Sequence, residues 1–288
     1  MSLSSEQHLS EREASYYNER EASFQANTDK ILHLEGKDAS KPKMEARKGN
    51  FTASNISRLL AGGTGATRMS YILEVALVSI GITDDFDNAA MRHGKHNEYD
   101  SFMGLYPTIF PDTKCTWFDK YIPFDANSGA SPDAIISDYF PFDIKHPFST
   151  YEYIKQCKQL PKKYYDQSQM QMMSLKAPLG YMCMVLVKPE KWGEENYKDY
   201  PIPLTQRYHC HTIHADEQRQ YEITLAVEKA VPARDALIEK LKAAKVIDEM
   251  EFFYEQLKHY CYRPIKEASN MLNVDFVRVN DEFYYKVK

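Results

Sequence analysis

The sequence predicts an α/β (α+β) domain in which helices flank a mixed central β-sheet. Short apolar segments bounded by turn residues are typical of strands, and a helical pattern at 161–177 lies between two groups of them. Strands followed by a helix and further strands, with helices around them, indicate this class. The strand-like segments are 115–124, 130–137, 139–148, 180–189 and 207–215.

The sequence predicts a boundary near residue 46 between an N-terminal extension and a folded domain. Residues 1–45 are predicted to be a polar extension, in which EREAS occurs twice and favours a charged helix. Residues 46–288 are expected to form a single domain with a helical segment and a hairpin at its C-terminal end. This domain begins at "NFTASNISRLLAGG", where Thr52 or Ser54 can cap a short helix that two glycines end.

Further helices are expected before and after the strands in the sequence. Residues 68–82 are mostly apolar and predict a buried helix, and residues 88–106 predict a second helix that contains Glu98. A helical pattern from 216 to about 260 is expected to break once, at Pro232. The final residues alternate around Asn280 and predict a terminal hairpin.

Composition indicates an intracellular protein. The chain has 288 residues, of which 43% are hydrophobic, and no apolar run approaches the ~20 residues of a membrane-spanning helix. The N-terminus lacks the apolar stretch of a secretory signal. We therefore expect a cytoplasmic location and no membrane partner. The five cysteines contain no CxxC pair, which predicts free thiols rather than disulfides or a metal cluster.

The net charge of −5, from 36 basic and 41 acidic residues, argues against a protein that coats nucleic acid over its whole surface. Any contact with DNA must then be local. Two basic stretches could supply it, at 37–48 and at 155–163, and tyrosines flank the second. A solvated face explains either stretch equally well.

The chemistry concentrates in "SGASPDAIISDYFPFDIKHPF", residues 128–148. In a strand, Asp143 and Lys145 share one face while Ile144 points to the other. A turn at 138–141 would bring Asp133 beside Asp143. Two carboxylates this close repel each other, so a divalent cation such as Mg²⁺ or Mn²⁺ is expected between them. Metal, water and Lys145 together could hydrolyse a phosphodiester. An isolated D-x-K is usually an exposed ion pair, but the preceding Pro-Asp favours a metal site.

The pattern Pro132-Asp133 followed by Asp143-Ile144-Lys145 is the signature of the restriction-endonuclease-like nucleases. Within that superfamily the sequence resembles the phage-lambda-type exonucleases, the alkaline exonucleases of viral recombination systems. The resemblance covers roughly residues 46–190, and more weakly the chain as far as about 240. It depends on blocks in the expected order, which are "RKGNFTASNISRLL", "RMSYILEVAL", "MRHGKHNEYDSF", "GASPDAI", "FDIKHPF" and "YYDQSQMQM".

The resemblance implies a restriction-endonuclease-like core and a Mg²⁺-dependent exonuclease, with Mn²⁺ as a possible substitute. Such an enzyme digests one strand of linear duplex DNA in the 5′-to-3′ direction and leaves 3′ overhangs. It implies a phage or prophage origin and a bacterial host. It also implies a single-strand annealing protein as partner and a ring-shaped homotrimer around DNA, which would explain how an acidic chain holds DNA.

The resemblance also implies roles for individual residues. Asp133 and Asp143 would hold the metal with support from Glu98, and Lys145 would assist the attacking water. Gln167 would be the catalytic glutamine; Gln171 lies one helical turn further on the same face, whereas Gln169 points elsewhere. The pocket for the terminal 5′-phosphate would contain Arg47, Ser54 and Ser131.

Two departures and three alternatives accompany this interpretation. Ala134 replaces the glycine that usually follows Pro-Asp, and Asp143 replaces the commoner glutamate. An endonuclease or nickase of the same superfamily is one alternative, and a catalytically silent DNA-binding module is another. A zinc site formed by His209, His211 and His214 is a third, although no acid or cysteine completes it.

Overall fold

The computed structural model describes residues 43–61, 66–82, 89–118, 120–188, 200–248, 251–252, 262–265, 271–280 and 282–286. The predicted polar extension, with both EREAS repeats, lies outside the described residues except for its last three positions. The glycines expected to end the first short helix lie outside them as well. No helix within the described ranges combines the length and apolar character needed to cross a membrane.

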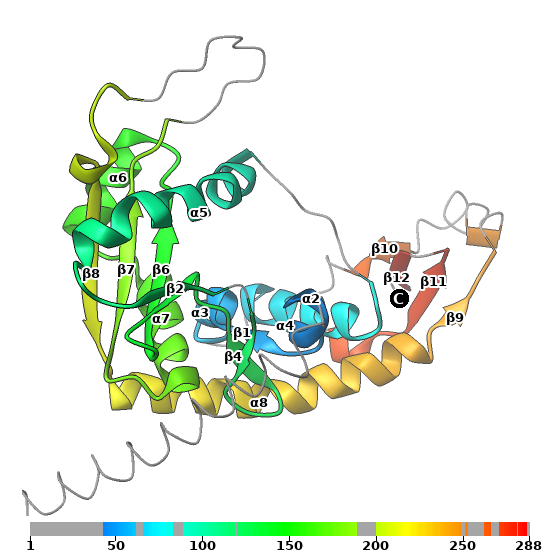
Figure 1. Cartoon of the computed structure of the whole chain (residues 1–288). Coiled ribbons are helices and arrows are strands. Elements are labelled where there is room, and N and C mark those ends of the chain that lie inside the picture. The colour runs from blue at the N-terminus through cyan, green and yellow to red at the C-terminus, as the bar shows by residue number, and fades with distance from the viewer. Residues whose placement is uncertain are drawn as a thin grey trace, which may run out of the picture.

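A five-stranded mixed sheet forms the centre of the larger lobe (Figure 1). Its order is β2-β5-β6-β7-β8, in which β6 and β7 are parallel and the other neighbours antiparallel. The predicted fold class is therefore confirmed. The strands are β2 (Cys115–Trp117), β5 (Ala134–Ile136), β6 (Phe140–Lys145), β7 (Leu179–Val185) and β8 (Tyr208–His214).

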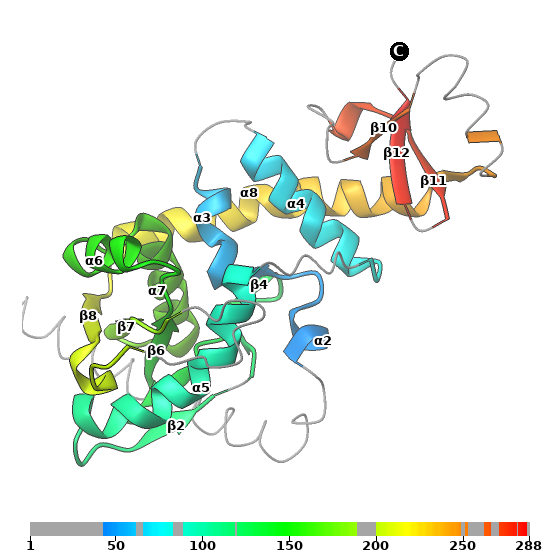
Figure 2. The same ribbon diagram turned by 90° about the horizontal axis from the view of Figure 1, so that it is seen from above.

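Helices cover both faces of this sheet, as Figure 2 shows. On one face, Phe102 and Leu105 of α5 (Ala89–Ile109) pack with Phe142 and Ile144 of β6. On the other face lie α6 (Thr150–Lys158) and α7 (Lys162–Leu175), and α7 buries Met172 and Leu175 against Met182 and Met184 of β7. Since β6 is enclosed from both sides, its polar residues are held in a largely dry environment.

A second, three-stranded sheet has the order β1-β4-β3, with β1 (Phe51–Thr52), β4 (Ser128–Ala130) and β3 (Ile122–Pro123). The predicted strands 115–124 and 130–137 are therefore each two strands in different sheets. Pro132 explains the second break, since proline cannot donate to a strand ladder. β3 and β4 approach so closely that a side chain at Gly129 would collide with Ile122 and Tyr121.

The helices near the N-terminus surround this small sheet. They are α2 (Lys43–Arg47), a 3₁₀ turn (Ala53–Asn55), α3 (Ile56–Leu59) and α4 (Ala66–Ser79). The predicted cap by Thr52 or Ser54 is wrong, because Asn55 is the N-cap of α3 and no side chain caps that helix or the 3₁₀ turn. Thr52 instead donates its backbone N–H to the Tyr71 hydroxyl at 2.8 Å, which ties β1 to α4.

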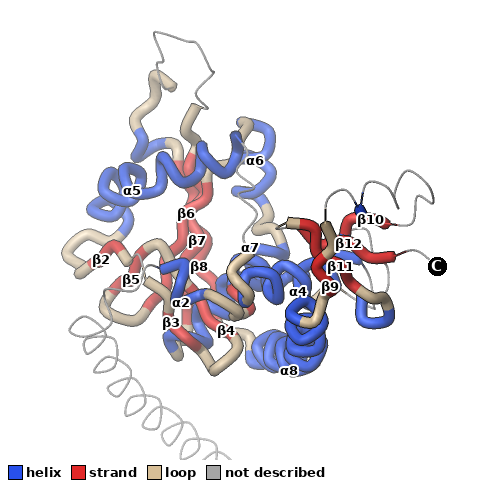
Figure 3. Tube along the Cα trace, turned by 90° about the vertical axis from the view of Figure 1, so that its right-hand side faces the viewer, coloured by secondary structure: helices blue, strands red, loops and turns tan. Residues whose placement is uncertain are grey.

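The helix α8 (Glu217–Lys242) runs from the central sheet to the C-terminal end of the molecule (Figure 1). The predicted break at Pro232 is wrong, because the helix continues through this residue. Buried residues on both sides of Pro232, among them Val227 and Leu237, pack into the same core as α4. This packing holds the helix continuous despite the backbone hydrogen bond that proline removes. Figure 3 shows α4 and α8 side by side.

The chain ends in a four-stranded sheet of order β10-β12-β11-β9. The predicted terminal hairpin is confirmed as β11 (Phe276–Val279) and β12 (Glu282–Lys286), with Asn280 in the left-handed conformation at φ 53°. The sheet also contains β9 (Lys245–Val246) and β10 (Tyr262–Pro264). Further 3₁₀ turns occur at Leu204–Gln206 and Met271–Asn273.

Candidate active site

The turn between β5 and β6 places Asp133 beside Asp143, as the sequence predicts. Ser137 and Asp138 adopt positive φ angles of 51° and 69°, and the two strands pair from Ala134 opposite Phe142. The Asp133 N–H donates to the Phe142 carbonyl at 3.1 Å. In return, Asp133 Oδ2 accepts a 2.7 Å hydrogen bond from the Ile144 N–H. The carboxylate of Asp133 is thus fixed against the strand that carries Asp143.

Asp143 is the centre of the cluster, with only 1% of the residue exposed. Its Oδ2 forms an ion pair with Lys145 Nζ and accepts a hydrogen bond from Gln167 Nε2 at 2.8 Å. Its Oδ1 accepts a hydrogen bond from Gln171 Nε2, also at 2.8 Å. Because Gln167 and Gln171 are one helical turn apart on α7, both amides reach the same carboxylate.

The electrostatics show why these carboxylates need a counter-charge. Burial removes the Asp133 carboxyl from water and raises its pKa well above the usual value, and the negative charge of Asp143 raises it further. The charge of Glu98 adds to this rise, whereas the positive charge of Lys145 opposes it. Burial lowers the pKa of Lys145, but the charges of Asp143 and Asp133 outweigh burial, so its pKa lies above the usual value. Lys145 is therefore an ammonium ion at neutral pH.

The chemistry of this donor set fits a hard divalent cation. Asp133 and Asp143 offer only oxygen ligands, which Mg²⁺ and Mn²⁺ prefer. Gln171 Oε1 is a further buried oxygen with no hydrogen-bond partner in the described part of the chain. Within the described residues, however, no three His, Cys, Asp or Glu side chains are gathered in an arrangement that could hold a metal. Glu98, on α5, acts on Asp133 through its charge.

The three residues expected to bind a 5′-phosphate lie around the small sheet. β1 and β4 are parallel, with Thr52 opposite Gly129. Two residues beyond this pair lie Ser54, in the 3₁₀ turn, and Ser131, just after the end of β4. Ser54 Oγ lies 3.3 Å from Thr52 Oγ1 and is exposed. Ser131 Oγ is buried without a hydrogen-bond partner in the described part. Arg47 ends α2, just before β1, and its charge reaches the phenols of Tyr71 and Tyr121.

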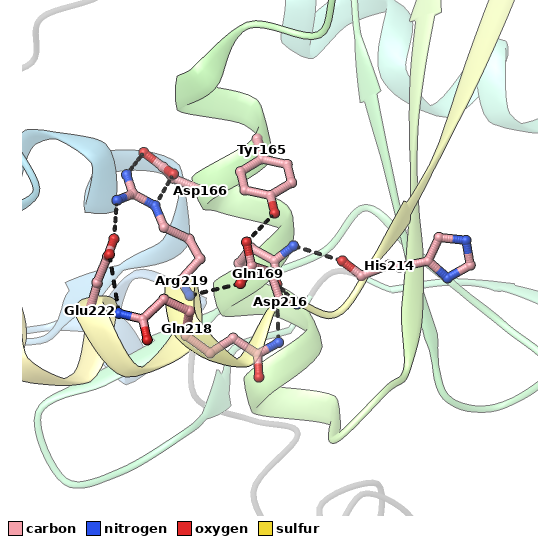
Figure 4. Close-up of polar contacts among 9 residues, drawn as sticks. Tyr165, Asp166, Gln169, His214, Asp216, Gln218, Arg219 and Glu222 are labelled. Atoms are coloured by element: carbon pink, nitrogen blue, oxygen red, sulfur yellow. Dashed lines mark hydrogen bonds and ion pairs between the residues drawn. The ribbon is translucent and has the colours of Figure 1, made fainter.

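Residues that sequence analysis missed hold α7 in place (Figure 4). Arg219 of α8 binds the buried Asp166 through two bonds, Nε to Oδ1 at 2.8 Å and Nη2 to Oδ2 at 2.9 Å. Arg219 also binds Glu222 at 2.5 Å. Asp166 immediately precedes Gln167, so this pair fixes the turn of α7 that reaches Asp143.

A second set of contacts joins α7 to the end of β8. Gln169 Nε2 donates to the His214 carbonyl at 2.9 Å, and Gln169 Oε1 accepts from the Asp216 N–H at 2.9 Å. The Tyr165 hydroxyl donates to Asp216 Oδ2 at 2.7 Å. Gln169 therefore points away from Asp143, as expected. These pairs are about 45 to 51 positions apart in the chain and leave no local signal in the sequence.

The alternative zinc site is not assembled in the described part of the chain. The rings of His209 and His211 lie 4.5 Å apart, but His211 Nε2 is 2.8 Å from the Gln156 carbonyl. His214 follows on the opposite face of the strand, and Figure 4 shows its ring directed away from the polar contacts around Asp216. The three histidines thus do not converge.

Comparison with known proteins places this geometry in a family. Residues 44–177 match the model of the YqaJ-like viral recombinase domain. The alkaline exonuclease LHK-Exo from Laribacter hongkongensis is 26% identical over 69% of this chain and 95% of its own, with a TM-score of 0.57. The same exonuclease in complex with dAMP gives 28% identity, coverage of 70% and 95%, and a TM-score of 0.56.

A phage-related exonuclease from Haemophilus somnus 129PT has the same fold. It is 17% identical over 67% of this chain and 96% of its own, with a TM-score of 0.55. No curated protein matches the sequence. The viral recombinase domain at 44–177 and the likeness to LHK-Exo confirm the predicted resemblance of this chain to the lambda-type alkaline exonucleases.

Proposed function

We propose that the chain is a divalent-metal-dependent exonuclease that degrades one strand of linear duplex DNA from its 5′ end. The family supports a nuclease connected with recombination. One observation carries the finer proposal: Lys145, Gln167 and Gln171 all bind Asp143, next to an Asp133 whose pKa is raised by burial and by that same carboxylate. The complex of the similar LHK-Exo with dAMP, a building block of DNA, supports the substrate class.

Asp133 and Asp143 would hold Mg²⁺ or Mn²⁺, with Glu98 close enough to add negative charge. Such an ion, when bound, lowers the pKa of a coordinated water and polarises the phosphoryl oxygen. Gln167 and Gln171 keep the Asp143 carboxylate in one orientation through their amide N–H groups. Lys145 carries a positive charge at the same place and can offset the negative charge of a phosphodiester or orient the attacking water.

Arg47, Ser54 and Ser131 are proposed to seat the terminal 5′-phosphate. A guanidinium and two hydroxyls are suitable donors for a phosphate group. The buried Ser131 hydroxyl without a hydrogen-bond partner supports such a ligand, because a buried polar group that stays unpaired is costly. Ser131 lies two residues before Asp133, so a phosphate held there would be close to the metal-binding carboxylates.

The α6 surface is proposed as the DNA path that leads to the site. We use this name for the exposed side chains of Tyr151, Ile154, Lys155 and Lys158. Helix α6 begins five residues after Lys145, and 71% of Tyr151 is exposed. Lysine neutralises phosphates, and an exposed aromatic ring can stack on a base.

The proposed products and partners follow from this activity. Digestion of one strand leaves a 3′ single strand, which a single-strand annealing protein would bind. A ring-shaped homotrimer would enclose the duplex and let an acidic chain hold DNA with few cations. Light scattering of the full chain, with and without a duplex, measures the oligomeric state that this proposal requires.

The test is digestion of linear duplex DNA labelled at one 5′ or one 3′ end, in Mg²⁺ or in EDTA. We expect mononucleotide release from the 5′-labelled strand in Mg²⁺ and none in EDTA. We also expect faster digestion of 5′-phosphorylated than of 5′-hydroxyl ends, and loss of that preference in Arg47→Ala. Equal digestion of both ends by the unmutated protein contradicts the phosphate pocket, and release from the 3′ label first contradicts the direction.

The two alternative functions give different results in the same assay. An endonuclease or nickase cuts closed circular duplex, whereas an exonuclease that needs an end leaves it intact. A catalytically silent DNA-binding module releases no nucleotide in any metal but still binds the duplex. The pocket residues favour the exonuclease, since an endonuclease has no terminal phosphate to bind.

A further inference from the structure

Cys183 of β7 and Cys210 of β8 are directly opposite each other in the central sheet. The two strands are antiparallel, so side chains of directly opposed residues point to the same face. Both residues pack in the cluster that α5 covers, Cys183 fully buried and Cys210 half-buried. Both are free thiols.

The hydrogen-bond pattern shows which kind of pair they form. Leu186 N–H donates to the Arg207 carbonyl at 2.9 Å, and Ala215 N–H donates to the Pro178 carbonyl at 2.9 Å. Both of these are directly opposed pairs in the same register as Cys183 and Cys210. Hydrogen-bonded and non-hydrogen-bonded pairs alternate along an antiparallel ladder. Since Cys183 is an odd number of residues from both Pro178 and Leu186, Cys183 and Cys210 form a non-hydrogen-bonded pair.

This position suits a disulfide bond. Opposed Cα atoms in a non-hydrogen-bonded pair lie about 4.5 Å apart. Disulfides span Cα separations of about 4.4 to 6.8 Å, so the pair falls at the short end of the permitted range. A bond at this limit carries strain, and strained disulfides are more easily reduced than relaxed ones. Such a bond would form in oxidising conditions and be reversed by thiols.

One of the two thiols can be reached from solvent. Cys210 lines an open hollow of about 710 Å³ between β8 and the end of α5, together with Phe110, Tyr181 and Tyr208. The hydrogen bond with Cys210 and, to a lesser extent, burial raise the pKa of the Cys183 thiol. Cys183 is therefore less readily converted into the thiolate that attacks disulfides. An oxidant would therefore meet Cys210 first.

We propose that Cys183 and Cys210 are a redox-active thiol pair that small disulfides convert into a cross-strand disulfide. The thiolate of Cys210 attacks one sulfur of a disulfide such as oxidised glutathione, forms a mixed disulfide and releases one glutathione thiolate. Cys183 then attacks the Cys210 sulfur, and its proton passes to the second glutathione, which leaves as a thiol. Two protein thiols are oxidised and one small disulfide is reduced to two thiols.

The modification lies next to the candidate active site. Ile144 of β6 is opposite Cys183 in the parallel β6–β7 pair, and the Ile144 N–H holds Asp133 Oδ2. The disulfide would therefore join β8 to the strand that lies beside Ile144, the residue whose N–H orients the proposed metal ligand Asp133. The thiol chemistry itself is independent of the proposed nuclease activity.

The test is peptide mapping of the folded full chain after incubation with oxidised glutathione and alkylation of the remaining thiols. We expect the tryptic peptide with Cys183 joined to the peptide Tyr208–Arg219, and we expect dithiothreitol to separate them. A variant with Cys115, Cys157 and Cys261 replaced by serine retains only the pair, and it should form the same link with equal yield at tenfold dilution.

Cys210→Ser is the matched control, because it changes a half-buried side chain and removes one partner. It should lose the linked peptide and leave Cys183 open to alkylation after denaturation. The proposal is overturned if both thiols of the three-serine variant remain alkylatable, or if glutathione stays on Cys210 without transfer. A link from Cys183 to Cys157 in the unmutated chain also overturns it.

Discussion

The two aspartates of the candidate site differ in how well the protein stabilises their charges. Asp143 is satisfied by Lys145 and two glutamines, whereas Asp133 has the Ile144 N–H and the repulsion of Asp143. A charge that is costly in the metal-free protein is useful once a divalent cation is present. Under the proposed function, Asp133 destabilises the metal-free protein through a charge that a bound cation would offset.

Replacement of Asp133 by asparagine separates these two demands. Asparagine still accepts the Ile144 N–H but carries no charge. Because the pKa of Asp133 is raised in the folded protein, its stabilising contribution is complete at low pH and is lost as pH rises through that raised value. We expect Asp133→Asn to abolish cleavage and to raise the melting temperature in metal-free buffer at neutral pH. A lower melting temperature at neutral pH would contradict this account, and the difference between the two proteins should vanish in acid.

The glutamines of α7 should affect metal use without affecting the fold. Gln171→Leu removes the N–H that binds Asp143 Oδ1 while filling the same buried volume. We expect a loss of roughly 10- to 100-fold in activity or in metal affinity, the usual effect of a residue that orients a ligand. Titration of activity with Mg²⁺ measures it. Ser174→Ala is the control: the Ser174 hydroxyl donates to the Met170 carbonyl of its own helix, so its loss should leave the titration unchanged.

The sequence predicts the short-range part of this site well. Asp133, Asp143 and Lys145 lie within thirteen positions, and the period of a strand and the length of a turn suffice to bring them together. The i, i+4 spacing likewise places Gln167 and Gln171 on one face. The bond of Asp166 to Arg219 spans 53 positions and depends on how two helices pack, which no local pattern encodes.

At the scale of elements, the site depends on the docking of α7 between the sheet and α8. Asp166 is 1% exposed, and its carboxylate is neutralised by an Arg219 whose side chain is 13% exposed. The pKa of Arg219 is raised, chiefly by its hydrogen bonds to Asp166. A buried ion pair is costly to break from one side, because the remaining charge keeps no partner.

A double-mutant cycle tests this helix contact. Arg219→Met leaves Asp166 buried and unpaired, and we expect a loss of about 3 to 5 kcal/mol in the free energy of unfolding. Arg219→Met combined with Asp166→Leu should recover most of the loss, because neither charge remains. Urea unfolding measures each variant. Glu222→Gln, which removes the exposed partner of Arg219, should change stability little, and equal losses in all variants would refute the role of the buried pair.

Elements also show where local patterns fail. Helix α6 was not predicted, since its lysines and tyrosines read as a basic stretch, yet Ser149 caps it by accepting the Glu152 N–H at 3.2 Å. Pro232 was expected to break α8, but core packing on both sides of it outweighs the lost hydrogen bond. At Pro232 tertiary contacts decide the result, whereas α6 begins at a local cap that sequence analysis missed. Helices α4 and α7 follow the prediction from the sequence.

At the scale of the whole molecule, the C-terminal sheet is part of the main core. Phe276 and Phe283 are buried in the same cluster as Leu73 of α4 and Leu237 of α8. The hairpin was predicted from its sequence, but its place in the same core as α4 and α8 was not, because this core joins residues as far apart in the chain as Leu73 and Phe283.

This packing predicts cooperative unfolding. We expect Phe283→Ala to lower the free energy of unfolding by about 3 to 5 kcal/mol, the usual cost of a large cavity in a core. The change should appear in one transition that includes the central sheet, measured by urea unfolding with hydrogen exchange. Val246→Ala, at a residue 70% exposed in the same sheet, is the control. A separate early transition confined to β10–β12 would contradict a shared core.

The net charge leads to a prediction about how the whole molecule holds DNA. An acidic chain can bind DNA only through a few cations, so the salt dependence of binding should be shallow and should depend on the α6 surface. Each phosphate contact contributes about 0.9 to the slope of log affinity against log salt concentration. We expect Lys155→Gln with Lys158→Gln to reduce this slope by about 2 and to weaken binding equally for all sequences.

The control is Lys229→Gln, at an exposed lysine of α8, which leaves the slope unchanged if the DNA path is local. Fluorescence anisotropy with a labelled duplex in Ca²⁺, over a range of salt concentrations, gives the slopes. An identical slope in the double variant and the unmutated protein would place the DNA path elsewhere on the molecule.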